Sequence, residues 1–133
     1  MSAPMFVLVS MAGGLGASAR FVIDAAIGAR AAGTVPWATI VINLSGSLVL
    51  GLLLGLATGT ALPRGWQPAA GAGFLGGYTT FSAASVEVVT LMRNRRWAAG
   101  ALTAFGSIAG ATAAAALGIW TGSAMGGEMC GAS

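Results

Sequence analysis

Uncharged, mostly apolar runs divide the sequence into four segments. They lie at positions 1–19, 31–63, 65–86 and 97–127, which contain no Asp, Glu, Lys or Arg. A helix that crosses the hydrocarbon core of a bilayer needs about 20 predominantly apolar residues. The pattern therefore predicts an all-α membrane protein with four transmembrane helices. We expect the spans at about residues 5–27, 37–59, 68–92 and 98–122.

Tryptophan falls near the ends of the predicted spans, as Trp37, Trp66, Trp97 and Trp120. This placement is typical of the aromatic belts found at both membrane–water interfaces. The spans leave loops of only a few residues, with no room for a soluble catalytic domain. We therefore expect residues 1–133 to form a single transmembrane domain, with any function inside the helical bundle.

Small residues recur four positions apart in two of the spans. The second span carries Ser47, Gly51, Gly55 and Gly59, and the fourth carries Gly106, Gly110, Ala114, Gly118 and Gly122. Each series places small residues on one helix face, where they let two backbones approach closely in lipid. Plain packing between helices is the first interpretation of these faces, and dimerisation is the second.

Composition agrees with a membrane protein and narrows the function. Only 7% of the residues are charged, against about a quarter in soluble domains. All six basic residues are arginine and there is no histidine, so no dense basic face for nucleic acid and no His-dependent catalytic site is expected. Cys130 is the single cysteine, which excludes an internal disulfide. No enzyme motif is present, and we expect a non-enzymatic protein.

The third span contains the most informative polar run, Gly76-Gly77-Tyr78-Thr79-Thr80-Phe81-Ser82. Paired glycines followed by β-branched and aromatic residues make a poor continuous helix, so we expect a break near mid-membrane. One interpretation is that the freed backbone groups form an ion site, as in the broken helices of transport proteins. The other is a kinked helix whose hydroxyls bond to their own backbone. The residues alone leave both open.

Polar residues in the other spans are further candidates, because such groups are costly inside a membrane. Asn43 lies in the second span, and Glu87 follows the polar run of the third. Arg20 and Asp24 are one turn apart in the first span. These two form either a neutralising pair within the helix or the interfacial end of the span. Arg20 would attract anions if it lay near a pore mouth.

Taken together, these segments resemble the CrcB/Fluc family of small fluoride channels. The resemblance covers all four spans in order and is carried by three motifs: residues 13–21 (GGLGASARF), 43–47 (NLSGS) and 73–82 (GFLGGYTTFS), with Glu87 in step. It implies a fluoride-selective channel that lowers cytoplasmic fluoride by passive export across the inner (plasma) membrane. It also implies an antiparallel dimer with two pores.

The resemblance further implies roles for particular residues. Backbone carbonyls of Gly76 and Thr79 would hold a structural sodium ion at the dimer centre. Asn43 would donate a hydrogen bond to fluoride, and Phe81 would present its ring edge, the positive side of an aromatic ring. Arg20 would shape the vestibule and Glu87 would belong to a polar track. The full expected ion pathway is Arg20, Asn43, Thr80, Phe81, Ser82, Ser85 and Glu87.

Two departures bear on the partner of the chain. Family members usually carry a second phenylalanine three residues after the first, and this chain has Ala84 there. Charge is also uneven, since the two loops expected on one face hold Arg30, Arg93, Arg95 and Arg96, whereas the opposite face holds Arg64. Positive charge favours the cytoplasmic side, so we expect both termini outside. A single orientation predicts a heterodimer with a related, oppositely oriented subunit; the alternative is an antiparallel homodimer.

Two other functions stay open at this point. A small proton-coupled drug exporter would also have four helices, but its mechanism needs an acid deep in the first span, where this chain has only Asp24 near the end. A non-conducting partner subunit of a heterodimeric channel is the third possibility, because Ala84 removes half of the expected aromatic pair.

Overall fold

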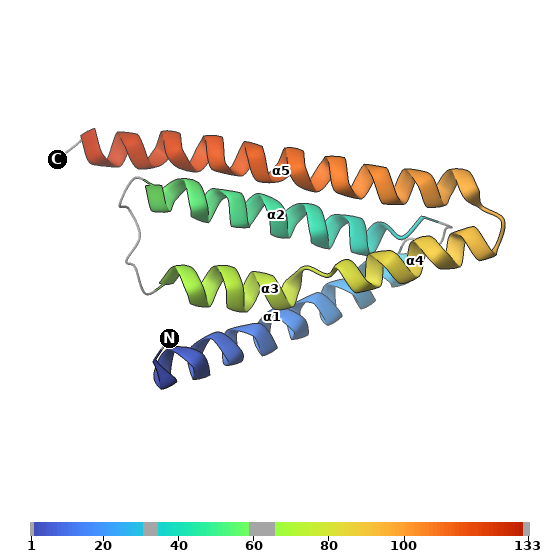
Figure 1. The fold of residues 1–133 in the computed structure, drawn as a ribbon, viewed down its shortest axis with the longest axis horizontal. Coiled ribbons are helices and arrows are strands. Elements are labelled where there is room, and N and C mark those ends of the chain that lie inside the picture. Colours follow the sequence, from blue (N-terminus) through green and yellow to red (C-terminus); the bar gives the residue numbers. More distant parts are fainter. Residues whose placement is uncertain (1, 31–34, 59–65, 132–133) are drawn as a thin grey trace.

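The computed structural model describes residues 2–30, 35–58 and 66–131 and arranges them as an elongated bundle of helices (Figure 1). No β-strand occurs within these three ranges. The helical elements are α1 (Ala3–Arg30), α2 (Trp37–Thr58), η1 (Pro68–Leu75), α3 (Gly76–Tyr78), α4 (Phe81–Arg93) and α5 (Trp97–Gly131). Successive long segments run in opposite directions. Helix α5 packs on α2, and α1 packs on η1 and α3.

Three helices are long and apolar enough to cross a membrane, namely α1, α2 and residues 97–128 of α5. The third predicted span, 68–92, is divided into the shorter elements η1, α3 and α4, none of which is that long alone. The bounds of the fourth predicted membrane span, 98–122, stay a prediction. Helix α5 continues past residue 122 to Gly131, because no proline or turn sequence stops it there.

The third helical region is interrupted at two threonines. Thr79 (φ −79°, ψ 152°) and Thr80 (φ −149°, ψ 124°) both have extended backbone between α3 and α4. Before them, η1 is a wide π-helical segment, in which the Gly76 N–H donates to the Gly71 carbonyl five residues earlier. The depth of this interruption in a bilayer stays a prediction.

Glycines let α2 and α5 pack at very close range. A Cβ added at Gly51, Gly55, Gly118 or Gly122 would overlap backbone atoms of the facing helix. The prediction that the two small-residue faces pack helices is therefore confirmed. Their assignment to a dimer contact is wrong for these four positions, because the two faces meet each other inside the chain. Gly59, the last member of the first series, lies outside the described residues.

A second glycine contact joins α1 to the third helical region. Built Cβ atoms on Gly16 and Gly77 would overlap the backbone carbonyls of Phe74 and Gly13, respectively. The bundle therefore consists of two tightly packed pairs, α2 with α5 and α1 with η1 and α3. The interrupted threonine segment lies where the two pairs meet, since Gly46 of α2 faces the side chain of Thr79.

Two neighbouring glycines of α1 give a matched test of this packing. We expect Gly16→Ala to lower the free energy of unfolding by about 1–3 kcal/mol, because the new methyl group meets the Phe74 backbone. Gly14 has no atom within 4 Å of a built Cβ, so Gly14→Ala should be neutral or raise stability by about 0.5–1 kcal/mol. Thermal unfolding in detergent measures both, and equal melting temperatures for the two variants would contradict the close contact.

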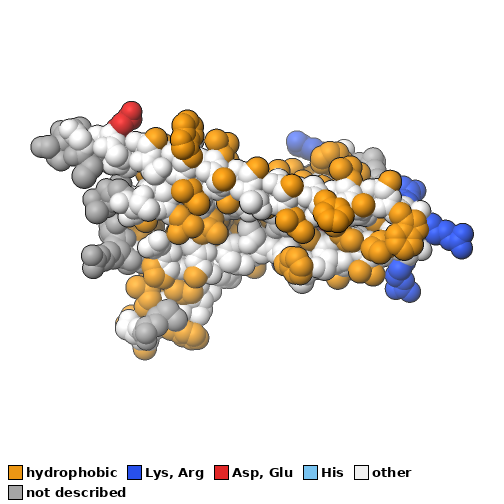
Figure 2. All heavy atoms as spheres, turned by 45° about the horizontal axis from the view of Figure 1, so that its top comes forward, with side chains coloured by type: hydrophobic (Ala, Val, Ile, Leu, Met, Phe, Trp, Pro, Cys, Tyr) orange, Lys and Arg blue, Asp and Glu red, His pale blue; other side chains and the backbone are white. Residues whose placement is uncertain are grey.

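The surface of the bundle is apolar along its length and basic at one end (Figure 2). Large side chains such as Phe21, Phe81 and Phe105 are more than 70% exposed, which fits lipid or a second subunit and not water. The basic end holds Arg30, Arg93, Arg95 and Arg96, as the loop pattern predicted. Arg64, expected at the opposite end, lies outside the described ranges.

Candidate functional site

The interruption of the third region is closed by one side chain of α2. Asn43 Nδ2 donates to the Thr80 carbonyl at 3.1 Å, and the Thr80 backbone N–H donates to Asn43 Oδ1 at 3.0 Å. Both backbone groups of Thr80 are thus satisfied where no helix can satisfy them, which is essential away from water. Asn43 therefore holds the non-helical segment against α2.

These hydrogen bonds release two specific backbone carbonyls. In a continuous α-helix, the N–H groups of Thr80 and Ala83 would donate to the carbonyls of Gly76 and Thr79. Here the Thr80 N–H goes to Asn43, and the Ala83 N–H goes to the Thr80 hydroxyl at 3.3 Å. The oxygens of Gly76 and Thr79 are left without their usual helical donors. Unwound carbonyls of this kind suit a monovalent cation, so this part of the chain fits sodium.

Hydroxyl groups near the interruption mostly bond to their own backbone. Thr79 Oγ1 donates to the Leu75 carbonyl and Ser85 Oγ to the Phe81 carbonyl, each at 2.9 Å. This matches the second interpretation of the polar run for these two residues. Thr80 and Ser82 share one hydrogen bond between their hydroxyls at 3.1 Å, so one of the two protons stays uncommitted.

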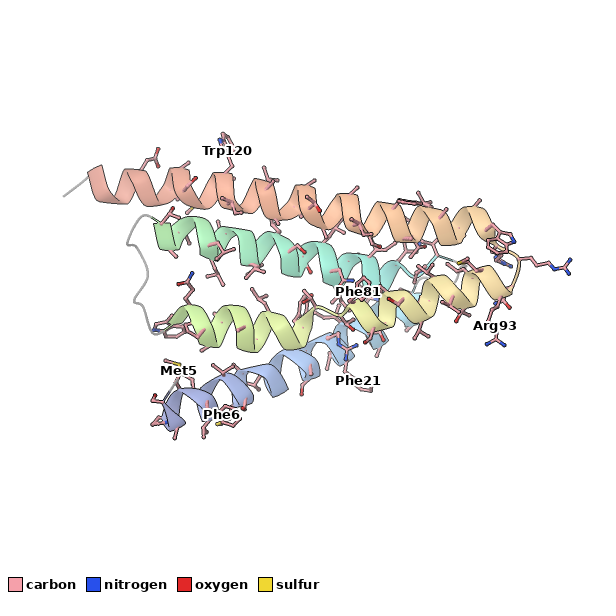
Figure 3. The ribbon with its side chains drawn as sticks, viewed as in Figure 1. Met5, Phe6, Phe21, Phe81, Arg93 and Trp120 are labelled. Atoms are coloured by element: carbon pink, nitrogen blue, oxygen red, sulfur yellow. The ribbon has the colours of Figure 1, made fainter. Side chains whose placement is uncertain are left out.

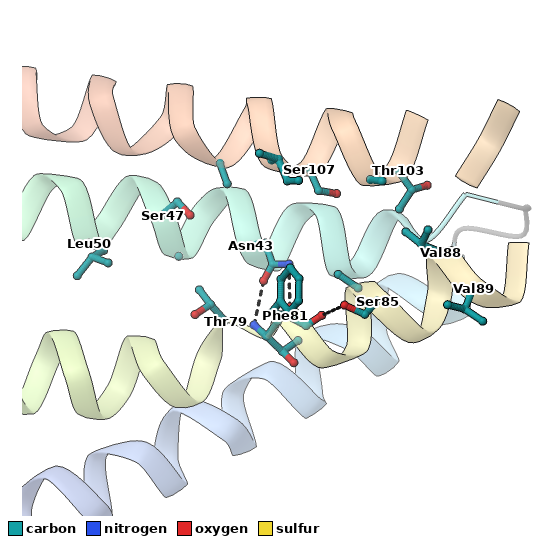
Figure 4. A pocket seen from close by; sticks show the side chains of 16 residues that line it. Asn43, Ser47, Leu50, Thr79, Phe81, Ser85, Val88, Val89, Thr103 and Ser107 are labelled. Carbon is teal, nitrogen blue, oxygen red and sulfur yellow. Dashed lines mark hydrogen bonds between the residues drawn. The ribbon is translucent and has the colours of Figure 1, made fainter. Parts of the chain in front are cut away.

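A groove of about 510 Å³ opens beside this segment, between α2, α4 and α5 (Figure 4). Asn43, Thr79, Thr80, Phe81 and Ser85 all line it. The ring of Phe81, at the first turn of α4, is 82% exposed and lies at the groove. The structure therefore brings together five of the residues predicted from the sequence. Arg20, Ser82 and Glu87 are not among the residues that line it.

Ala84 also lines the groove, at the position expected for a second phenylalanine. Its methyl group leaves open the space that an aromatic ring would take. The groove is otherwise bounded mainly by apolar side chains, such as Leu50, Val88 and Ile108. The groove is thus a mostly apolar opening on the surface of the bundle, with a small polar patch in its lining.

Two hydroxyls of α5 complete the polar lining, and sequence reasoning missed their role. Thr103 and Ser107 are buried, one turn apart, and both line the groove. Thr103 donates to the Ala99 carbonyl at 2.8 Å. Ser107 Oγ has no hydrogen-bond partner within the part of the chain that the structure describes. The four-residue spacing of two hydroxyls in a span of Ala, Gly and Leu is the signal that would have found them.

Glu87 points to α2 and not to the arginines that follow it. Thr39 Oγ1 donates to Glu87 Oε1 at 2.9 Å, and Thr39 is only 4% exposed. The other carboxylate oxygen, Oε2, is buried without a partner among the residues described. Thr39 was not singled out from the sequence, because nothing in the sequence pairs positions 39 and 87. The pair ties α4 to the first turn of α2.

Arg20 and Asp24 do not form the predicted neutralising pair. No ion pair joins them in the described structure, although they are one turn apart on α1. The Nε atom of Arg20 is buried and has no partner in the resolved ranges. The interfacial interpretation of Arg20 stays a prediction, since α1 continues past it to Arg30.

The family described as "CrcB-like protein, Camphor Resistance (CrcB)" matches residues 7–119, which include the groove and the threonine interruption. The chain belongs to the CrcB family. With its three apolar, membrane-length helices, this CrcB chain is a multi-pass membrane protein. Membership of this family also agrees with the expectation that the chain is not an enzyme.

Curated relatives support the same assignment over most of the chain. "Fluoride-specific ion channel FluC 1" of Leifsonia xyli subsp. xyli is 49% identical over 120 residues, covering 90% of this chain and 88% of the relative. "Fluoride-specific ion channel FluC 2" of Cutibacterium acnes is 42% identical over 116 residues, covering 86% and 94%. The protein of that name in Mycobacterium bovis is 35% identical over 120 residues, covering 90% and 92%.

Proposed function

We propose that this chain is a fluoride-selective channel that lowers cytoplasmic fluoride by passive export. The observation that carries the proposal is the groove at which Asn43, Phe81 and Ser107 meet beside a non-helical backbone segment. The names of the relatives agree with it. An interior-negative membrane potential drives an anion outward by about 2.3 kcal/mol per 100 mV, so export needs no coupled ion.

The groove offers the kind of groups that a strongly hydrated anion needs. Asn43 has a second N–H on Nδ2 beyond the one given to Thr80, and the Ser107 hydroxyl is free to turn toward an ion. The exposed ring of Phe81 adds a positively polarised edge. Together these replace part of the hydration shell without placing a full positive charge in the pore, which would trap the anion.

A structural sodium ion is the second part of the proposal. Gly76 and Thr79 would hold it through the two carbonyls that have lost their helical donors. When bound, the cation would supply the positive charge that balances these two carbonyl oxygens. Two carbonyls from one chain are few for a cation, so an equivalent pair from an oppositely oriented subunit would complete the shell. The proposed sodium ion would then lie at the centre of an antiparallel dimer.

The exposed groove fits the same assembly. A second subunit would cover Phe81 and add its own groups at the opening beside Ala84. Fluoride release from liposomes that contain the purified chain tests the proposal. Release from the chain alone indicates an antiparallel homodimer, and release only after adding a related subunit indicates a heterodimer. Retention of fluoride in both preparations would contradict the channel proposal.

Ser107 gives a prediction that separates conduction from folding. We expect Ser107→Ala to lower fluoride efflux severalfold, because the groove loses an uncommitted donor. The free energy of unfolding should stay within about 0.5 kcal/mol, because the hydroxyl has no partner to lose. Thr112→Ala is the matched control, since the Thr112 hydroxyl is exposed and bonds within its own helix at 2.8 Å. Equal efflux from both variants would remove Ser107 from the ion path.

A further inference from the structure

The basic end of the bundle is not used by the proposed pore. It comprises Arg30, the last residue of α1, with Arg93, Arg95 and Arg96 around the turn between α4 and α5. All four are exposed, and the basic side chains gather at that end in Figure 2. Glu87, the acid nearest to this turn along the chain, is engaged by Thr39. Four arginines against the two nearest carboxylates, Asp24 and Glu87, leave the basic end with a net positive charge.

Two indole rings place the basic end at the level of lipid headgroups. Trp37 begins α2 and Trp97 begins α5, both at this end and both more than half exposed. Exposed tryptophans of membrane helices lie at the membrane–water interface. Trp120, which points away from the bundle in Figure 3, lies roughly 35 Å farther along α5 at 1.5 Å per residue. This separation fits a hydrocarbon core of about 30 Å, so the arginines lie just outside it.

The turn between α4 and α5 contains an arginine in a backbone conformation that favours glycine. Helix α4 ends in a Schellman motif, in which the Arg96 N–H donates to the Leu91 carbonyl at 2.8 Å and the Arg95 N–H to the Met92 carbonyl at 3.1 Å. Arg95 has φ 58°, the left-handed conformation that this motif usually gives to glycine. No other non-glycine residue in the described ranges has a positive φ. An arginine at a position that favours glycine points to a use for its side chain.

We infer that the basic end binds the phosphate groups of anionic phospholipids in the leaflet that it faces. A guanidinium group presents a planar fork of donors that matches phosphate oxygens, which an ammonium group lacks. Arg30, Arg93 and Arg95 offer three such groups from two helix ends and one turn. Because they are attached to membrane helices and flanked by interfacial indoles, a lipid headgroup reaches them more readily than a dissolved anion. This binding is independent of the fluoride pathway.

Lipid titration of the full chain in neutral detergent tests the inference. Phosphatidylglycerol should raise the melting temperature in a saturable way, whereas phosphatidylcholine and inorganic phosphate should not. The double variant R93Q/R95Q should bind phosphatidylglycerol about 25-fold more weakly, since each arginine near an anionic surface contributes about fivefold. Glu128→Gln, at the other end of α5, should bind like the unmodified chain. Equal responses to the two lipids, or an unchanged affinity in R93Q/R95Q, would overturn the inference.

Arg95→Gly separates lipid binding from folding. Glycine relieves the left-handed backbone at this position, so the variant should melt at a higher temperature than the unmodified chain without lipid. It should still bind phosphatidylglycerol several-fold more weakly, because it lacks one guanidinium group. Undiminished binding by this more stable variant would show that Arg95 contributes no contact to the lipid.

Discussion

Asn43→Leu is expected to destabilise the chain by about 4 kcal/mol and to abolish fluoride conduction. Leucine has a similar volume but leaves the N–H and the carbonyl of Thr80 without partners. Each unsatisfied buried backbone group costs about 1–3 kcal/mol. The same change removes the amide donor that faces the groove. Stability and flux should therefore fall together, because one carboxamide closes the interrupted helix and contributes to the ion path.

The only other asparagine provides a matched control. Asn94 is exposed at the end of α4, so Asn94→Leu should change stability by about 0.5 kcal/mol or less. Thermal unfolding in detergent and fluoride efflux from liposomes measure the two effects separately. An Asn43→Leu variant that melts like the unmodified protein would contradict the closing role of the amide. A destabilised variant with normal efflux would contradict its place on the pathway.

Phe81→Leu is expected to slow fluoride efflux about tenfold while leaving the chain folded. The ring is 82% exposed, so a smaller apolar side chain removes little packing within the subunit. An aromatic ring edge contributes about 0.5–1.5 kcal/mol beyond its apolar area, and 1.4 kcal/mol is a factor of ten in rate. The loss should appear in flux, because leucine presents no positively polarised edge to the ion.

Phe105→Leu is the control for a general effect of removing an exposed ring. Phe105 lies on α5, is 74% exposed and does not line the groove. Both variants should melt close to the unmodified chain, and only Phe81→Leu should lose flux. Equal flux losses in the two variants would assign the effect to lipid contact and not to the groove.

The arrangement of helices could be predicted because charges, prolines and tryptophans mark the ends of apolar runs. The residue at which α5 ends could not be predicted. A Gly- and Ala-rich segment has the same composition whether the helix stops at the membrane surface or continues into water. The partners of the small-residue faces were also hidden. Gly51 and Gly118 meet each other's helices within one chain, and a stripe of small residues has the same pattern in a dimer contact.

The candidate site was partly predictable for a similar reason. The polar run around Thr79 and Thr80 disfavours a helix locally, so the local sequence predicts an interruption there. The partner that closes it, Asn43, is 37 positions away, and the Thr39–Glu87 pair spans 48 positions. Such pairs follow from the packing of α2 against the third region, which no local pattern reveals. Ser107 gains its importance in the same way, by facing a groove formed by three separate elements.

Fluoride release from liposomes is the most direct test of the central claim. The purified chain is reconstituted alone and with a related subunit, and the vesicles are loaded with equal fluoride and chloride under an imposed potential. Ion-selective electrodes then follow both anions. The account predicts rapid fluoride release with chloride retained in at least one of the two preparations. Retention of fluoride in both, or release of chloride at the same rate, would contradict it.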